Sequence, residues 1–420
     1  MKNTFLLLIF SVFVIALSSC KKNTEDESKP MFLFKIRFGK GGSGIVFLSD
    51  KNGDVISEKA WKSSSTVTFY LPENYSSSYP NFTVTMFKNA DNGLIKIRSY
   101  YDIIPGTDWE YFPNSLQFKY GNANVAFHNT PQHDNYILVT EDNFIQSNTS
   151  LPNGITYPYF DNLYDMILVL GVNDGHNKYL KIDDALNHVY IDLSNMESSV
   201  EANVDIGNSS GKLSYKLYGV SYDNPCSTDK FLIWKDDEIN PEISQLKIKY
   251  PPNMFELFKT YIRDEDGLNS WNQYTYGDIP DKLTRINADI HILNTSPLDC
   301  ELSTEGVFDY WGSVWKHEDA DNNLFYWYVK GPKGQTGYKL PKIPELIKEK
   351  HPNLKRELFV IRSSYVCDYD GFTSLQELNH TYYALGACYF EDPPNFRTKY
   401  VYKDNKGKSE DLYPEDYSKR

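Results

Sequence analysis

The 420-residue sequence is poor in cysteine, and its one long apolar run lies at the N-terminus. None of its five cysteines forms a CxxC pair, which argues against zinc ribbons and thioredoxin-like proteins. HExxH and HxH motifs are absent. The sequence therefore predicts no catalytic residue, no metal ligand and no cofactor.

Basic residues are in the minority, since 43 Lys and Arg stand against 56 Asp and Glu, for a formal net charge of -13. Without Lys2, which belongs to the N-terminal signal, 42 basic residues remain against 56 acidic ones, for a charge of -14. This balance argues against nucleic acid and anionic membrane faces as partners. A chain of this length predicts roughly two to four domains.

The N-terminal apolar run has the layout of an export signal. Lys2 supplies a positive start, residues 4–17 form the apolar core, and small residues precede Cys20. About 14 residues would span only about 21 Å as a helix, less than the roughly 30 Å of a bilayer core. A membrane-spanning helix is thus the poorer interpretation. An ordinary signal peptide with an accidental cysteine is the alternative.

The sequence Leu17-Ser18-Ser19-Cys20 resembles the lipobox of bacterial lipoproteins. The resemblance implies that residues 1–19 are removed and that Cys20 carries lipid, the protein's link to the membrane. Position 21 is Lys rather than the Asp of inner-membrane retention, which favours the outer membrane. Residues 20–30 are polar and charged after the cysteine, which predicts a flexible tether. This tether resembles the segment that sends lipoproteins of Bacteroidota to the cell exterior.

The remainder of the chain favours β-strands, because it is rich in Tyr and Phe and shows little helical periodicity. Residues 31–108 contain about seven short strands separated by turn residues, which fits an Ig-like β-sandwich. Residues 109–245 predict a second β-sandwich, and residues 246–420 a C-terminal β-rich domain. The fold class is therefore mainly β, in tandem Ig-like sandwiches. One or two short helices are expected in the last domain, at Pro341–His351 and Asn253–Ile262.

The first predicted sandwich also has a family resemblance. The stretch Ile45–Ile56, with its Asn-Gly turn, and the stretch Tyr101–Gly106 resemble small sandwich modules of Bacteroidota surface proteins, including carboxypeptidase-regulatory-like domains. The resemblance covers under a quarter of the chain. It implies a fold and brings no catalytic residues.

An aromatic hairpin at Phe308–Lys330 is the candidate binding surface. Strand alternation puts Trp311 and Trp315 on one face of its first strand, and the return strand is aromatic on both faces. An exposed row of such rings suits stacking on sugars. The alternative is that both faces are buried between layers or at a domain contact. The candidate binding residues are Trp311, Trp315, Trp327, Tyr326 and Tyr328.

Two further features have both a functional and a structural interpretation. Cys367 and Cys388 lie in two strand-like runs, which predicts a cross-strand disulfide, with buried thiols as the alternative. Acidic clusters at 50–54, 264–266 and 319–323 have some oxygen ligands for calcium but lack the closing Glu. Asp and Asn are ordinary turn residues, so turns are the favoured interpretation.

Together these features predict a non-catalytic, lipid-anchored protein of the outer membrane that faces the cell exterior and binds a glycan or a partner protein. One alternative is a surface glycoside hydrolase or peptidase, because a carboxylate pair needs only spatial proximity. Another is a structural subunit of a surface assembly or an adhesin.

Overall fold

The computed structural model describes residues 31–71, 81–88, 94–111, 120–140, 144–160, 166–171, 177–182, 190–207, 209, 211–220, 230–239, 243–384 and 395–403. Over these residues the fold is mainly β, as predicted, with helices only in the C-terminal part. No helix among them has the length and apolarity needed to cross a bilayer. The predicted signal peptide and tether, including Cys20, lie outside the described residues.

The described residues between 31 and 111 form two packed sheets, as strand alternation predicts. Phe34 and Ile36 of the first sheet pack with Val46 and Leu48 of the second, around Trp109. In spatial order the first sheet is β4 (Thr66–Tyr70), β1 (Phe32–Phe38) and β7 (Thr107–Tyr111). The second is β3 (Val55–Lys62), β2 (Ser43–Ser49), β5 (Phe82–Lys88) and β6 (Leu94–Ile103).

The second sheet continues well beyond this sandwich. β6 pairs in parallel with β25, with Leu94 opposite Leu324, and the sheet then runs on to a total of twelve strands. It draws strands from all three predicted segments, so the boundaries at residues 108 and 245 stay predictions. Beyond β6 the order is β25 (Leu324–Pro332), β24 (Tyr310–Glu318), β27 (Val360–Tyr369), β28 (Phe396–Tyr402), β21 (Asn269–Gly277), β20 (Leu257–Asp266), β17 (Lys212–Val220) and β18 (Lys230–Ile239).

A third layer covers part of this sheet, on the face that points away from the core of the N-terminal sandwich. β2 is buried on both faces, because Ile45 and Phe47 point away from the sandwich core and join a second cluster with Ile290 and Leu340 of this layer. Burial on both sides explains why the β2 sequence is apolar at consecutive positions. The layer consists of β22 (Ala288–Ser296), β23 (Asp299–Gly306), β26 (Gly337–Tyr338), α2 (Glu345–Lys348) and the 3-10 turn η2 (Arg356–Leu358).

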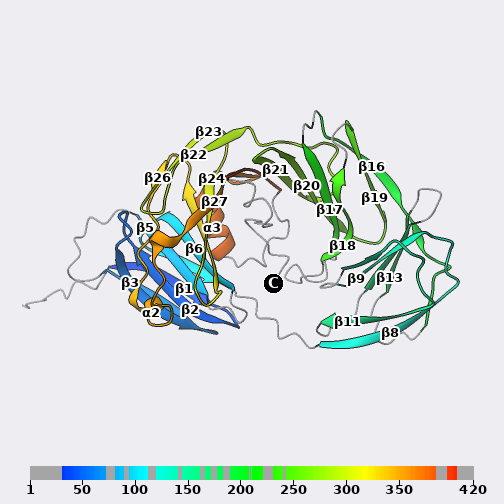
Figure 1. Ribbon diagram of the computed structural model, residues 1–420, viewed down its shortest axis with the longest axis horizontal. Coiled ribbons are helices and arrows are strands. Elements are labelled where there is room, and N and C mark those ends of the chain that lie inside the picture. The colour runs from blue at the N-terminus through cyan, green and yellow to red at the C-terminus, as the bar shows by residue number, and fades with distance from the viewer. Residues whose placement is uncertain are drawn as a thin grey trace, which may run out of the picture.

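The molecule is arch-shaped in Figure 1, with the N-terminal sandwich at one end, β17, β20 and β21 near the top, and β8 and β11 at the other end. One sheet of the far end is β10 (Phe144–Ser147), β9 (Asn135–Thr140), β12 (Met166–Gly171), β13 (Asn177–Ile182) and β15 (Glu197–Ser198). Two more are β11 (Gly154–Phe160), β8 (Tyr120–His128) and β14 (Tyr190–Asp192), and the pair β16 (Val200–Asp205) and β19 (Gln245–Tyr250).

The helices differ from the sequence prediction. The predicted helix at Pro341–His351 is reduced to the single turn α2. The predicted helix at Asn253–Ile262 is wrong, because β20 begins at Leu257 and pairs on both sides, with β17 and with β21. Tertiary pairing outweighs local periodicity there. A helix that the pattern did not predict, α3 (Leu375–Ala384), packs near β7 and β25.

Candidate functional site

The structure buries the aromatic hairpin that the sequence offers as a binding surface. Its strands are β24 and β25, and Trp311, Trp315 and Trp327 are each 0% exposed. The expectation of an exposed tryptophan row is therefore wrong, and the alternative of burial between layers holds. The reason is the third layer, which covers this face of the sheet.

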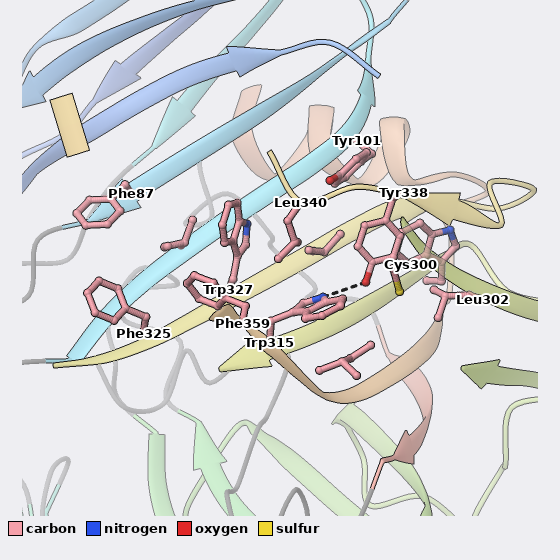
Figure 2. Packing of buried hydrophobic residues seen from close by; sticks show 14 of the residues in the cluster. Phe87, Tyr101, Cys300, Leu302, Trp315, Phe325, Trp327, Tyr338, Leu340 and Phe359 are labelled. Atoms are coloured by element: carbon pink, nitrogen blue, oxygen red, sulfur yellow. Dashed lines mark hydrogen bonds between the residues drawn. The ribbon is translucent and has the colours of Figure 1, made fainter. Parts of the chain in front are cut away.

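Hydrogen bonds fix two of the indoles within that core. Trp315 Nε1 donates to the Tyr338 hydroxyl oxygen at 2.9 Å and to Ser313 Oγ at 3.2 Å, and Figure 2 shows the first of these contacts. Trp327 Nε1 donates to Ser99 Oγ at 2.8 Å. Polar groups buried with their partners specify one packing arrangement. The Trp327–Ser99 bond joins β25 to β6 of the N-terminal sandwich.

The opposite face of the hairpin is also covered. Tyr326 is 9% exposed and Tyr328 is half-buried, and their rings lie 6.3 Å apart. They border a tyrosine-rich cluster that contains Tyr310, Tyr365 and Leu375 of α3. Both aromatic faces thus belong to the interior, and neither offers a flat platform for a sugar.

The acidic turns have the geometry of turns. Asp50 Oδ1 accepts the backbone N–H groups of Asn52 and Asp54, at 2.8 and 2.9 Å. Asp319 Oδ1 accepts those of Asp321 and Asn323 in the same way, at 3.0 and 2.8 Å. Among the described residues no group of three or more His, Cys, Asp or Glu side chains is placed to hold a metal ion.

The predicted disulfide between Cys367 and Cys388 stays a prediction. Cys367 is buried in β27, whereas Cys388 lies outside the described residues, as Cys20 does. Cys300 is buried beside Tyr338, and burial raises the pKa of its thiol to about 11. A thiol with a raised pKa is a poor nucleophile, so Cys300 is a packing residue.

A group of carboxylates meets Arg397 near the start of α3. Arg397 Nη2 donates to Asp368 Oδ2 at 2.6 Å and to Asp370 Oδ1 at 2.5 Å. Asp309, 6% exposed, accepts the backbone N–H of Tyr369 at 2.7 Å. Burial raises the pKa of Asp309 to about 6, and the charges of Asp368 and Glu377 act in the same direction.

The raised pKa of Asp309 should make stability depend on pH. An unfolded aspartate titrates near about 3.9, so between about pH 4 and pH 6 the folded chain holds more protons than the unfolded chain. Stability should then fall as pH rises through this window, with a slope approaching about 1.4 kcal/mol per pH unit from this group. Asp309→Asn keeps an acceptor for Tyr369 and should remove that component. Urea unfolding at several pH values tests this, and parallel profiles for both proteins would contradict it.

A polar-aromatic platform lies on the surface at the far end of the arch. It consists of His128 and Asn129 at the end of β8 and Tyr190 and Asp192 of β14. β8 and β14 pair in parallel, with Asp192 opposite His128. Strand alternation sends Ile191 into the core and its neighbours outward, so Tyr190 is 67% exposed.

Contacts within the platform hold its groups in place. The rings of His128 and Tyr190 lie 5.2 Å apart at 35°. Asn129 Nδ2 donates to Asp192 Oδ1 at 3.0 Å, and this bond lowers the pKa of the Asp192 carboxyl. Asn129 has a φ of 53°, in the left-handed region, which Asn adopts more readily than most non-glycine residues. The platform presents an aromatic face next to an ionised hydrogen-bond acceptor.

The sequence contains a local signal for one half of this platform. The stretch Val189–Leu193 alternates apolar side chains with Tyr190 and Asp192, which predicts that the latter two face solvent. His128 and Asn129 lie more than 60 positions earlier, and only the parallel pairing of β14 with β8 brings them alongside.

Comparisons with known proteins leave the platform to be judged by its own geometry. No family model and no curated protein matches the chain. Among solved structures, one similar chain is described as a Ca2+-stabilized adhesin that helps an Antarctic bacterium reach out and bind ice. It is 7% identical, with 79% of this chain and 87% of that chain covered, at a TM-score of 0.13. A likeness of that size carries no argument about the function of this chain.

Proposed function

We propose that the protein is a lipid-anchored, cell-surface binding protein of the outer membrane that takes an extracellular glycan at the polar-aromatic platform. The observation that carries the proposal is the exposed Tyr190 ring beside Asp192. The apolar face of a sugar ring packs on an aromatic ring, and its hydroxyl groups donate to a carboxylate. Cys20 supplies the anchor, as the lipobox resemblance implies.

The edge strand β22 is poorly suited to assembly by strand addition. β22 lies at the edge of a three-stranded sheet, and its pairing with β23 is irregular between Ile292 and Asn294. The intervening residue, Leu293, is 65% exposed. Irregular edge strands discourage pairing with a further strand.

A glycan array with the chain from Lys29 onward tests the platform. Tyr190→Ala should weaken binding about fivefold or more, because ring stacking is worth about 0.5–1.5 kcal/mol beyond the buried area. Tyr70→Ala is the matched control, since Tyr70 is 50% exposed in a different sheet, and it should bind as the unsubstituted chain does. Unchanged binding by Tyr190→Ala would exclude the platform. Absence of signal for every glycan would exclude glycan as the ligand.

Substitution of Cys20 tests the anchor. Cys20→Ala should keep residues 1–19 and should lose incorporation of labelled palmitate, because the acylated sulfur is gone. Lys22→Ala, two positions away, should be cut and acylated normally. Equal palmitate labelling of Cys20→Ala would contradict lipidation of this residue. Protease treatment of whole cells then reports whether the body faces the exterior.

A further inference from the structure

Three strand ends meet where the chain enters the N-terminal sandwich. β1 starts there, β4 ends there, and the turn between β6 and β7 lies beside them. The N–H of Leu71 donates to the carbonyl of Met31 at 2.8 Å, and the N–H of Gly106 donates to that of Leu33 at 2.8 Å. These bonds place the ends of three segments at one edge of the sandwich.

This edge presents large apolar side chains to solvent. Met31 is 43% exposed, Tyr70 is 50% exposed and Ile104 is 48% exposed, one from each segment. The half-buried Phe32 packs edge-on against Tyr70, with ring centroids 6.3 Å apart. We call these four residues the apolar rim. Single exposed apolar residues are common, but a group of them marks a contact surface.

The position of the rim in the chain indicates what covers it. Met31 comes eleven residues after Cys20. A fully extended chain spans at most about 3.6 Å per residue, so a lipid on Cys20 keeps the rim within about 40 Å of the bilayer. A surface tethered to a bilayer meets it at a high effective concentration, so even a weak apolar contact with the bilayer forms most of the time.

We propose that the apolar rim rests on the interface of the bilayer that holds the Cys20 lipid. This proposal rests on the proposed function, because it requires the anchor. Met31 and Ile104 suit the acyl boundary, and Tyr70 suits the headgroup level, where aromatic side chains with a polar end are enriched. Asp102, close to Ile104 in sequence, accepts a hydrogen bond from Asn81 Nδ2 at 2.6 Å.

Seating of the rim would also orient the molecule. The N-terminal sandwich and the strands β8 and β11 lie at opposite ends of the arch (Figure 1). With the sandwich end on the membrane, the end that holds β8 and β11 lies across the arch from the contact.

Fluorescence quenching in vesicles tests the proposal. The full lipidated protein carries an environment-sensitive label at Ile104→Cys, in phosphatidylcholine vesicles with a quencher on the lipid. The matched control is a label at Leu293→Cys, because Leu293 is also exposed but belongs to β22. Unsubstituted protein taken through the labelling gives the background of the native cysteines. Quenching at position 104 should exceed that at 293 at least about twofold, since interfacial contact buries side chains by about 5–10 Å.

Two further measurements separate the possible failures. Met31→Asp together with Tyr70→Asp should halve the quenching at position 104, or reduce it further, while the protein stays with the vesicles. Equal quenching at 104 and 293 in protein whose mass shows acylated Cys20 would overturn the rim proposal and leave the anchor intact. Protein whose mass shows no acyl chain would overturn the anchor and the rim proposal together.

Discussion

Replacing Trp315 with alanine should lower the free energy of unfolding by about 3–5 kcal/mol. The indole is 0% exposed and packs edge-on against the Tyr338 ring, at a centroid distance of 6.3 Å. Its removal leaves a cavity beneath the third layer and takes a donor from the hydroxyl groups of Tyr338 and Ser313. Urea unfolding followed by circular dichroism measures the loss.

A conservative variant and a surface variant serve as controls for this result. Trp315→Phe keeps most of the ring but not its N–H, so it should lose less, about 1–3 kcal/mol. Leu293→Ala changes an exposed side chain and should stay within about 0.5 kcal/mol of the unsubstituted protein. A loss below about 1 kcal/mol for Trp315→Ala would place the indole outside the core.

Replacing Arg285 with methionine should lower the free energy of unfolding about as much as Trp315→Ala does. Asp264 on β20 is 3% exposed, and Arg285 donates to its Oδ2 from Nε at 3.0 Å and from Nη2 at 2.5 Å. Ser209 donates to the other oxygen at 2.8 Å. Arg285→Met leaves a buried carboxylate without its cation, which costs about 3–5 kcal/mol in comparable cases.

The matched test is the double substitution Asp264→Leu with Arg285→Met. Replacing both members of a buried ion pair with apolar side chains is often neutral, so the double variant should be more stable than Arg285→Met alone. Urea midpoints of the two single variants and the double variant give the coupling energy. Additive losses would mean that the two side chains do not interact.

Local pattern predicted the N-terminal strands closely. About seven short strands are expected in residues 31–108, and the described part of that segment holds β1 to β6 and the start of β7, because alternation and turn residues act over a few positions. The helix α3 also had a local signal: Ser374 Oγ accepts the N–H of Glu377, and the Glu377 carboxylate accepts that of Thr373. Ser-x-x-Glu is the sequence form of this capping arrangement.

What the sequence could not predict depends on contacts between distant segments. Period-two alternation correctly separates Trp311 and Trp315 from Tyr310, but it cannot tell which face a further layer covers. That layer comes partly from Tyr338 and Leu340, beyond the hairpin itself. The platform likewise depends on contacts between distant segments, since a parallel strand pair brings His128 and Tyr190 together.

The parallel pairing of β6 with β25 has a consequence for how the chain acquires its fold. Leu94 must find Leu324, 230 positions later, and contacts of such long sequence separation make folding slow. A chain synthesised from its N-terminus presents Ile45, Phe47 and Phe87 before their covering layer exists. We therefore expect a long-lived, aggregation-prone intermediate, which persists until the second half of the chain can pack on the first.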